Sequence, residues 1–164
     1  MSKAKIDKVS EFLRESNAIE DVWDDQSLKQ ALEAWHYLIE WGELETAAIL
    51  HAHRILMKDK LEGDKLGRWR KVPVWIGGRE GKPWYVIPEL MSQWIKIANH
   101  GARIKPIQDD VFINDHVAFE SIHPFIDGNG RMGRMLMNWQ RVRAGAPILV
   151  IKEAEKQEYY KWFK

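Results

Sequence analysis

The chain has 164 residues, of which 45% are hydrophobic and 30% are charged, a composition typical of a single globular domain. This composition excludes a disordered chain and a collagen-like repeat, and no apolar run reaches the roughly 18 residues that a membrane span needs. The net charge of +1 excludes an overall basic surface for nucleic acid, and the lack of cysteine excludes disulfides, thiolate metal sites and a cysteine nucleophile.

The first part of the chain carries the hydrophobic period of α-helices. Such stretches cover residues 6–23, 27–41 and 44–57. In the first stretch the period is interrupted near Ser16 and Asn17, which predicts a break in that helix.

A different pattern fills the middle of the chain. Two β-prone runs, at residues 72–76 and 84–86, flank a glycine-rich turn, which predicts a β-hairpin. Pro73 and Pro83 favour a hairpin that lies at an edge. Helical periodicity then returns over residues 88–101, 107–122, 130–143 and 153–163. We therefore predict an all-α fold of about six to eight helices with one β-hairpin.

Reactive residue types are concentrated in residues 123–134, which read His-Pro-Phe-Ile-Asp-Gly-Asn-Gly-Arg-Met-Gly-Arg. This segment forms a predicted loop and the start of the following helix. His123 is a candidate general base, because a neutral imidazole accepts protons near neutral pH. Asp127 is a candidate metal ligand.

The second half of this segment has the composition of a phosphate site. Gly128, Asn129 and Gly130 lead into a helix N-terminus, where free N–H groups and the helix dipole attract anions. Arg131 and Arg134 are three residues apart and therefore share a helix face. Two guanidinium groups and a carboxylate at a helix N-terminus predict a site for a polyphosphate and Mg²⁺.

Other interpretations of these glycines fit less well. Gly128, Gly130 and Gly133 match the spacing of the dinucleotide fingerprint, but that fingerprint follows a strand and a helix is predicted here. A P-loop in residues 76–83 fails at two required positions. A glycine-rich turn with surface arginines would explain any one of these residues, but not all of them in this order.

Residues 123–134 resemble the signature of the Fic family, H-P-F-x-D-G-N-G-R-x-x-R, at every specified position. The flanking helices and the hairpin are also similar to that family, and the resemblance spans roughly residues 44–163. It implies the Fic fold and a reaction in which AMP passes from ATP to a Ser, Thr or Tyr hydroxyl of a target protein. Auto-modification is included among the expected reactions.

The resemblance also implies a role for each residue of the signature. His123 would be the general base, and Asp127 would hold Mg²⁺ on the phosphates. The expected ATP-binding residues are Gly128, Asn129, Gly130, Arg131 and Arg134. The hairpin resembles the flap on which the family aligns an extended target segment by strand addition, and its expected docking residues are Trp75, Ile76, Gly77 and Gly78.

An inhibitory element is expected at the N-terminus. Ser16 and Glu20 match the family's inhibitory motif, [S/T]-x-x-x-E-[G/N], whereas Asp21 departs from it. The resemblance implies that Glu20 pairs with Arg134 and occupies the guanidinium that should receive the γ-phosphate. We therefore divide the chain into an inhibitory region, 1–25, and a catalytic Fic domain, 26–164, within one compact unit.

The leading hypothesis is a protein adenylyltransferase inhibited by its own N-terminal helix. The alternatives are removal of AMP from a modified protein, use of another nucleotide donor, and a catalytically quiet nucleotide-binding regulator or toxin–antitoxin component. We expect ATP and a target protein as partners, with no nucleic acid or membrane, and a homodimer is compatible with the sequence. The composition and the lack of a readable signal peptide favour a cytoplasmic location.

Overall fold

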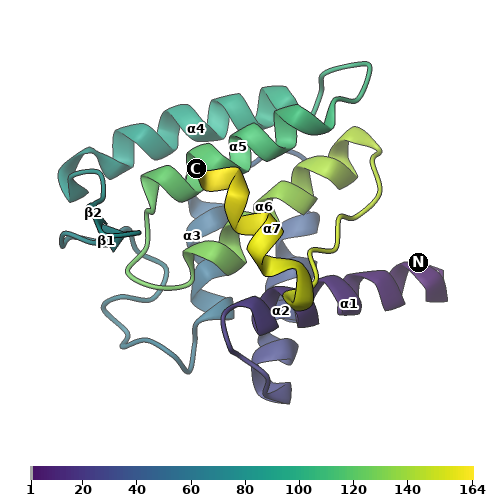
Figure 1. Ribbon diagram of the computed structural model, residues 1–164, viewed down its shortest axis with the longest axis horizontal. Helices are drawn as coiled ribbons and strands as arrows, with labels where there is room; N and C mark the ends of the chain where they lie inside the picture. The colour runs from purple at the N-terminus through teal and green to yellow at the C-terminus, as the bar shows by residue number, and fades with distance from the viewer. Residues whose placement is uncertain (1) are drawn as a thin grey trace.

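The chain folds into helices around one central helix, with a short hairpin at one end (Figure 1). The structure is a computed structural model that describes residues 2–164. The helices are α1 (Lys3–Ile19), α2 (Asp25–Ile39), α3 (Thr46–Leu56), α4 (Ile87–Gly101), α5 (Asp109–Ile122), α6 (Asn129–Ala144) and α7 (Lys156–Tyr160), and the strands are β1 (Trp75–Ile76) and β2 (Arg79–Glu80). The predicted all-α fold with one hairpin is confirmed.

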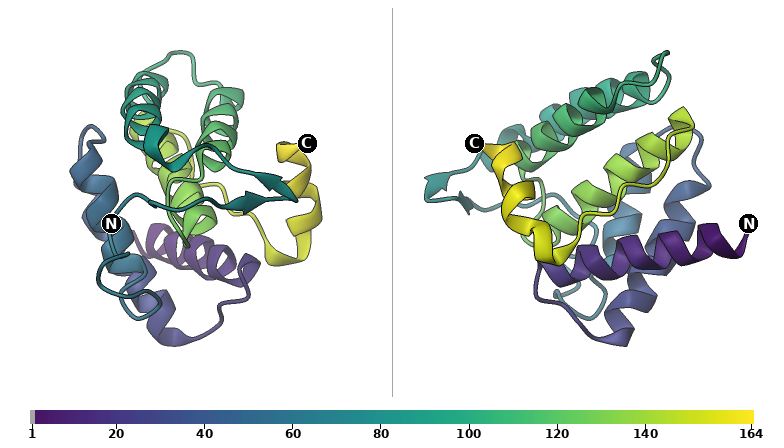
Figure 2. Two further views of the ribbon diagram at one scale, coloured as in Figure 1. Left: turned by 90° about the vertical axis from the view of Figure 1, so that its left-hand side faces the viewer. Right: turned by 45° about the vertical axis from the view of Figure 1, so that its right-hand side comes forward.

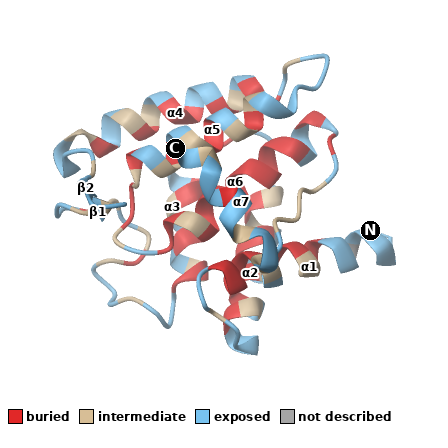
Figure 3. Ribbon diagram, in the orientation of Figure 1, coloured by how far each residue is buried: buried red, intermediate tan, exposed pale blue. Residues whose placement is uncertain are grey.

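Helix α6 forms the centre of the molecule, and 13 of its 16 residues are buried (Figure 3). Its apolar side chains at Met132, Met135, Leu136 and Trp139 follow the helical spacing and enter the main hydrophobic core. Helices α1, α2, α4 and α5 all contact α6. The functional segment at the start of α6 therefore rests on the most enclosed element of the fold.

Helix α1 is continuous through Ser16 and Asn17, so the predicted break was wrong. Both side chains are buried, and Ser16 contacts a guanidinium from α6. Ser16 interrupts the apolar period because it meets a polar partner, not because the helix ends. The helix stops instead at Ile19, and Asp21 adopts a left-handed φ of 57° in the turn that follows.

The hairpin is shorter than predicted, and its second strand lies elsewhere. Trp75 pairs with Glu80 and Ile76 with Arg79 around a two-residue turn, whose glycines both have positive φ. Residues Trp84–Val86, predicted as the second strand, form a 3-10 helix that leads into α4. A two-residue turn places 79–80 opposite 75–76, so the ladder is complete before residue 84 is reached. Figure 2 shows the hairpin projecting from the helical body.

The C-terminal stretch was predicted as one helix over 153–163. It consists of three short pieces, Glu153–Glu155, α7 and Lys161–Phe163, of which the first and last are 3-10 helices. The other predicted helices agree with the structure to within about four residues at each end. Within residues 2–164, no helix combines the length and the hydropathy needed to cross a membrane.

Candidate active site

The loop between α5 and α6 reverses the chain with two left-handed residues. His123 ends α5 with a φ of 51°, and Gly128 precedes α6 with a φ of 87°. A Cβ atom at Gly128 would lie 2.8 Å from the sulfur of Met57, so only glycine fits there. The loop thus begins at His123 and leads directly into the N-terminus of α6.

The loop is held from within by the side chain of Asn129. Its Oδ1 accepts a hydrogen bond from the N–H of Phe125 at 2.9 Å, and its Nδ2 donates to the carbonyl of Phe125 at 2.8 Å. Asn129 was predicted among the ATP-binding residues. Its side-chain amide is engaged within the loop, so a phosphate would meet the main chain at this position.

His53, on α3, supports the loop from outside. Its ring stacks on Phe125 with centroids 3.8 Å apart, and its Nε2 lies 2.9 Å from the carbonyl oxygen of Asp127. The N–H of Gly67 donates to Nδ1, which leaves Nε2 as the donor to Asp127. Burial lowers the pKa of His53 to about 4, so the ring is neutral. The sequence carries no local signal for this role, because the partners lie up to 74 residues away.

A polar cavity of about 200 Å³ opens at the N-terminus of α6. It brings together seven of the predicted site residues from two parts of the chain, the end of α1 and residues 123–131. The lining residues are Glu20, His123, Ile126, Asp127, Gly128, Asn129, Gly130 and Arg131. The first N–H groups of α6 have no partner within the helix, and they give this end of the cavity a positive potential.

His123 is one of the residues that line this cavity. Its Nδ1 is buried and makes no hydrogen bond to the described part of the chain. Burial lowers the pKa of His123, and the cation of Arg70 lowers it further, against the opposing effects of the Glu120 carbonyl, Asp127 and Glu20. The imidazole is therefore neutral near pH 7, which is the form that accepts a proton.

Asp127 offers a carboxylate to the cavity. Its Oδ1 accepts from the N–H of Gly128 at 2.7 Å and lies 4.0 Å from the nearest guanidinium nitrogen of Arg131. No cluster of three or more metal-ligating side chains occurs within residues 2–164. An exposed single carboxylate fits Mg²⁺, which commonly takes one or two protein carboxylates and completes its shell with phosphate oxygens and water.

Arg134 lies below the cavity and is 2% exposed. Its guanidinium donates to Oγ and to the carbonyl of Ser16, both at 2.9 Å, and to Glu20 Oε1 at 2.7 Å. The same carboxylate sits over Gly130, where a Cβ atom would lie 2.2 Å from Glu20 Oε1. The predicted pair of Glu20 and Arg134 is therefore present as a contact.

A buried polar layer behind Arg134 was not predicted from the sequence. The hydroxyl of Tyr159 accepts from Arg134 at 3.2 Å and lies 2.8 Å from Nε2 of His116. Glu120 lies against the same helices, and burial raises its pKa to about 7, an effect that Arg134 opposes. Tyr159 is buried, and its hydroxyl orients the arginine.

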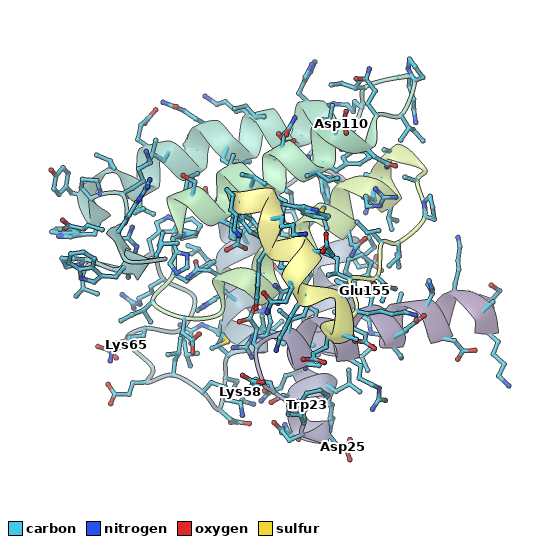
Figure 4. All side chains as sticks on the ribbon, in the orientation of Figure 1. Trp23, Asp25, Lys58, Lys65, Asp110 and Glu155 are labelled. Atoms are coloured by element: carbon cyan, nitrogen blue, oxygen red, sulfur yellow. The ribbon has the colours of Figure 1, made fainter. Side chains whose placement is uncertain are left out.

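The hairpin residues predicted to dock a target lie outside the cavity. Neither Trp75 nor Ile76 lines it, and Trp75 is 70% exposed. Tyr85 is also exposed beside the hairpin, and Figure 4 shows ring side chains projecting from this end of the molecule. The hairpin thus presents an exposed edge at one side of the loop between α5 and α6, as a docking strand would require.

Comparisons with known proteins show the family and the fold of this chain. A model of the Fic/DOC family matches residues 43–140. "Protein adenylyltransferase Fic" of Drosophila persimilis is 32% identical over 131 residues, which is 77% of this chain and 25% of the relative. The corresponding protein of Drosophila erecta is 33% identical over 131 residues, or 77% of this chain and 26% of the relative. The chain therefore spans about a quarter of the length of these curated relatives.

Solved structures share the fold. A Fic domain containing signaling protein from Bacteroides thetaiotaomicron superimposes with a TM-score of 0.80 at 21% identity, over 97% of this chain and 72% of that one. Fic-1 from C. elegans gives a TM-score of 0.79 at 20% identity, over 98% of this chain and 57% of that one. Since the family model covers more than half of the sequence and these structures share its architecture, the chain belongs to the Fic/DOC family.

Proposed function

We propose that this protein transfers AMP from ATP to a Ser, Thr or Tyr hydroxyl of a target protein and releases pyrophosphate. The observation that carries the proposal is the cavity that joins His123 to the N-terminus of α6. The curated relatives named protein adenylyltransferase support the same reaction.

Each residue of the cavity has a part in this reaction. His123 takes the proton from the target hydroxyl, whose oxygen attacks the α-phosphorus while the bond to pyrophosphate breaks. The main-chain N–H groups at Gly128–Gly130 and the guanidinium of Arg131 hold the phosphates. Mg²⁺ held by Asp127 would neutralise charge on the phosphate oxygens when bound. The site therefore acts through positioning and charge, which suits phosphoryl chemistry.

The contact of Glu20 with Arg134 provides the inhibition in this proposal. Arg134 is the second guanidinium of the phosphate site, and while Glu20 binds it the γ-phosphate has no partner there. The nucleotide then lacks one of its anchors and does not adopt the reactive orientation. Removal of the Glu20 carboxylate frees the guanidinium and activates the enzyme.

Labelled ATP tests the reaction. Wild type, Glu20→Gly, His123→Ala and the double variant are incubated with a cell lysate and ATP labelled at the α-phosphate or at the γ-phosphate. We expect Glu20→Gly to raise the transfer of α-label to protein, and His123→Ala in that background to lower it by about 100-fold to 10,000-fold. His51→Ala, which changes an exposed histidine, is the matched control.

Two results would contradict the proposal. Transfer of γ-label alone would indicate a kinase reaction, and no labelled protein with Glu20→Gly would leave the site without the proposed activity. One observation favours a second reaction, the removal of AMP from a modified protein: the Glu20 carboxylate lines the same cavity as His123 and could position water there. Release of AMP from a modified protein that requires both residues would identify that reaction.

A further inference from the structure

Arg70 lies in the segment before the hairpin and is only 3% exposed. A buried guanidinium needs hydrogen-bond partners, because an unpaired buried charge is costly. The partners of Arg70 are main-chain carbonyls: its side chain donates to four of them. Guanidinium has five N–H groups in a planar fork, so one side chain can hold several carbonyls in a fixed arrangement.

Two of these carbonyls belong to the end of α5. Arg70 Nε donates to the carbonyl of His123 at 2.7 Å, and an NH2 group reaches that of Ile122 at 3.4 Å. The main-chain N–H of Arg70 also donates to the carbonyl of Pro124 at 2.8 Å. His123 has a left-handed backbone here, and the last carbonyls of a helix have no partner within it. Arg70 therefore fixes the backbone from which the imidazole projects.

The other two carbonyls belong to the base of the hairpin. Arg70 donates to Val72 at 2.9 Å on the entering side and to Lys82 at 2.6 Å on the leaving side. The strands have two residues each, and beyond them the N–H of Gly81 donates to Val74. Isolated two-stranded hairpins are marginally stable at best, so the anchor at the base determines where the hairpin lies.

We infer that Arg70 is a positioning residue that joins the hairpin to the catalytic loop, so that a target segment on the hairpin lies at a set distance from His123. This inference rests on the proposed function for its consequence in catalysis. The guanidinium does not line the nucleotide cavity, so it acts on the target side of the reaction and leaves nucleotide binding unchanged.

Kinetics in the activated Glu20→Gly background measure that consequence. We expect Arg70→Gln to lower kcat by about 100-fold and to raise KM for the target protein, with KM for ATP unchanged, because misplacement by about 1 Å costs a reaction this much. Arg70→Lys keeps the charge but offers its donors from one atom, so we expect an intermediate kcat. Arg68→Gln removes an exposed arginine two residues away and should match the parent enzyme.

Hydrogen exchange tests the link between the hairpin and the loop independently of the proposed reaction. In Arg70→Gln we expect faster exchange in residues 72–82 and 122–125 together, with α2 unchanged. Equal exchange in Arg70→Gln and Arg68→Gln, or a loss of protection spread over the whole molecule, would overturn the inference. A rise in the KM for ATP equal to that for the target would overturn it as well.

The two proposals fail separately. If Glu20→Gly transfers no AMP while residues 72–82 and 122–125 exchange together in Arg70→Gln, the reaction is wrong and the link between hairpin and loop stands. If Arg70→Gln does not fold, the same exchange measurement is made on Arg70→Lys. Unchanged exchange in Arg70→Lys relative to wild type then overturns the link.

Discussion

Arg134 connects three helices through one side chain. It belongs to α6, it binds Ser16 and Glu20 at the end of α1, and it reaches Tyr159 on α7. Different nitrogens of the guanidinium donate to Ser16 Oγ, Tyr159 and Glu20. Loss of any one of these hydrogen bonds therefore leaves the others in place. Each hydrogen bond that is removed should therefore weaken the attachment of α1 to α6 by a further amount.

Ser16→Ala should release the inhibition in part. The change removes the bond from Arg134 Nε to Ser16 Oγ, while the main-chain carbonyl of the same residue still accepts. A hydrogen bond to a charged group contributes about 1.5 kcal/mol or more, so AMP transfer should rise about tenfold but stay below that of Glu20→Gly. Labelled ATP measures the rise, and Ser10→Ala, elsewhere on α1, should behave as wild type.

The close approach of α5 and α6 explains a glycine that the family signature leaves unspecified. A Cβ atom at Gly133 would lie 2.2 Å from Glu120 Oε1 and 2.8 Å from a ring carbon of His116. The signature requires Arg131 and Arg134 but not the residues between them. The glycine is thus needed for packing of the two helices.

Helix α7 stabilises this helix pair through one hydroxyl. Tyr159→Phe removes the acceptor of Arg134 and the partner of His116, and leaves buried polar groups unpaired. We expect a loss of about 1–3 kcal/mol in the free energy of unfolding, or roughly 2–4 °C in Tm for each kcal/mol. Thermal unfolding followed by circular dichroism measures it. Tyr160→Phe, at a more exposed position, is the control, and equal Tm values for the two variants would contradict the expected role.

The molecule as a whole buries two neutral histidines. Burial lowers the pKa of His53 to about 4 and that of His116 to about 3, the latter aided by the cation of Arg134. Both rings gain a proton on unfolding at any pH between these values and about 6.5. The unfolded state then binds more protons, so the free energy of unfolding falls as the pH drops below 6.5. Glu120 acts in the opposite direction, since its raised pKa favours the folded state below about 7.

His116→Gln should therefore make stability less dependent on pH. We expect the Tm of wild type to fall from pH 6.5 to pH 4.5 and that of His116→Gln to fall less steeply, because the opposing effect of Glu120 then offsets most of the effect of His53. His36→Gln changes an exposed histidine and should keep the slope of wild type. If the Tm of all three proteins changes with pH in the same way, the buried ring of His116 does not determine the loss of stability at low pH.

Local patterns along the chain were enough to locate the helices and to place the candidate site at a helix N-terminus. Hydrophobic periodicity depends on neighbours three and four residues apart, so it located the helices to within a few residues. Residues 123–134 are contiguous, and their place at a helix N-terminus follows from local geometry alone. The contact of Glu20 with Arg134 was predicted across 114 residues only because the family resemblance supplied the partner.

Contacts between residues that are distant along the chain account for the features that local patterns did not predict. They kept α1 continuous at Ser16, placed the second strand at 79–80, and gave Arg70, His53 and Tyr159 their partners. No local pattern marks these residues, because an arginine or histidine looks the same in sequence whether it is solvated or buried. Their roles arise only when packing of the helices removes water and leaves each polar group with one available partner.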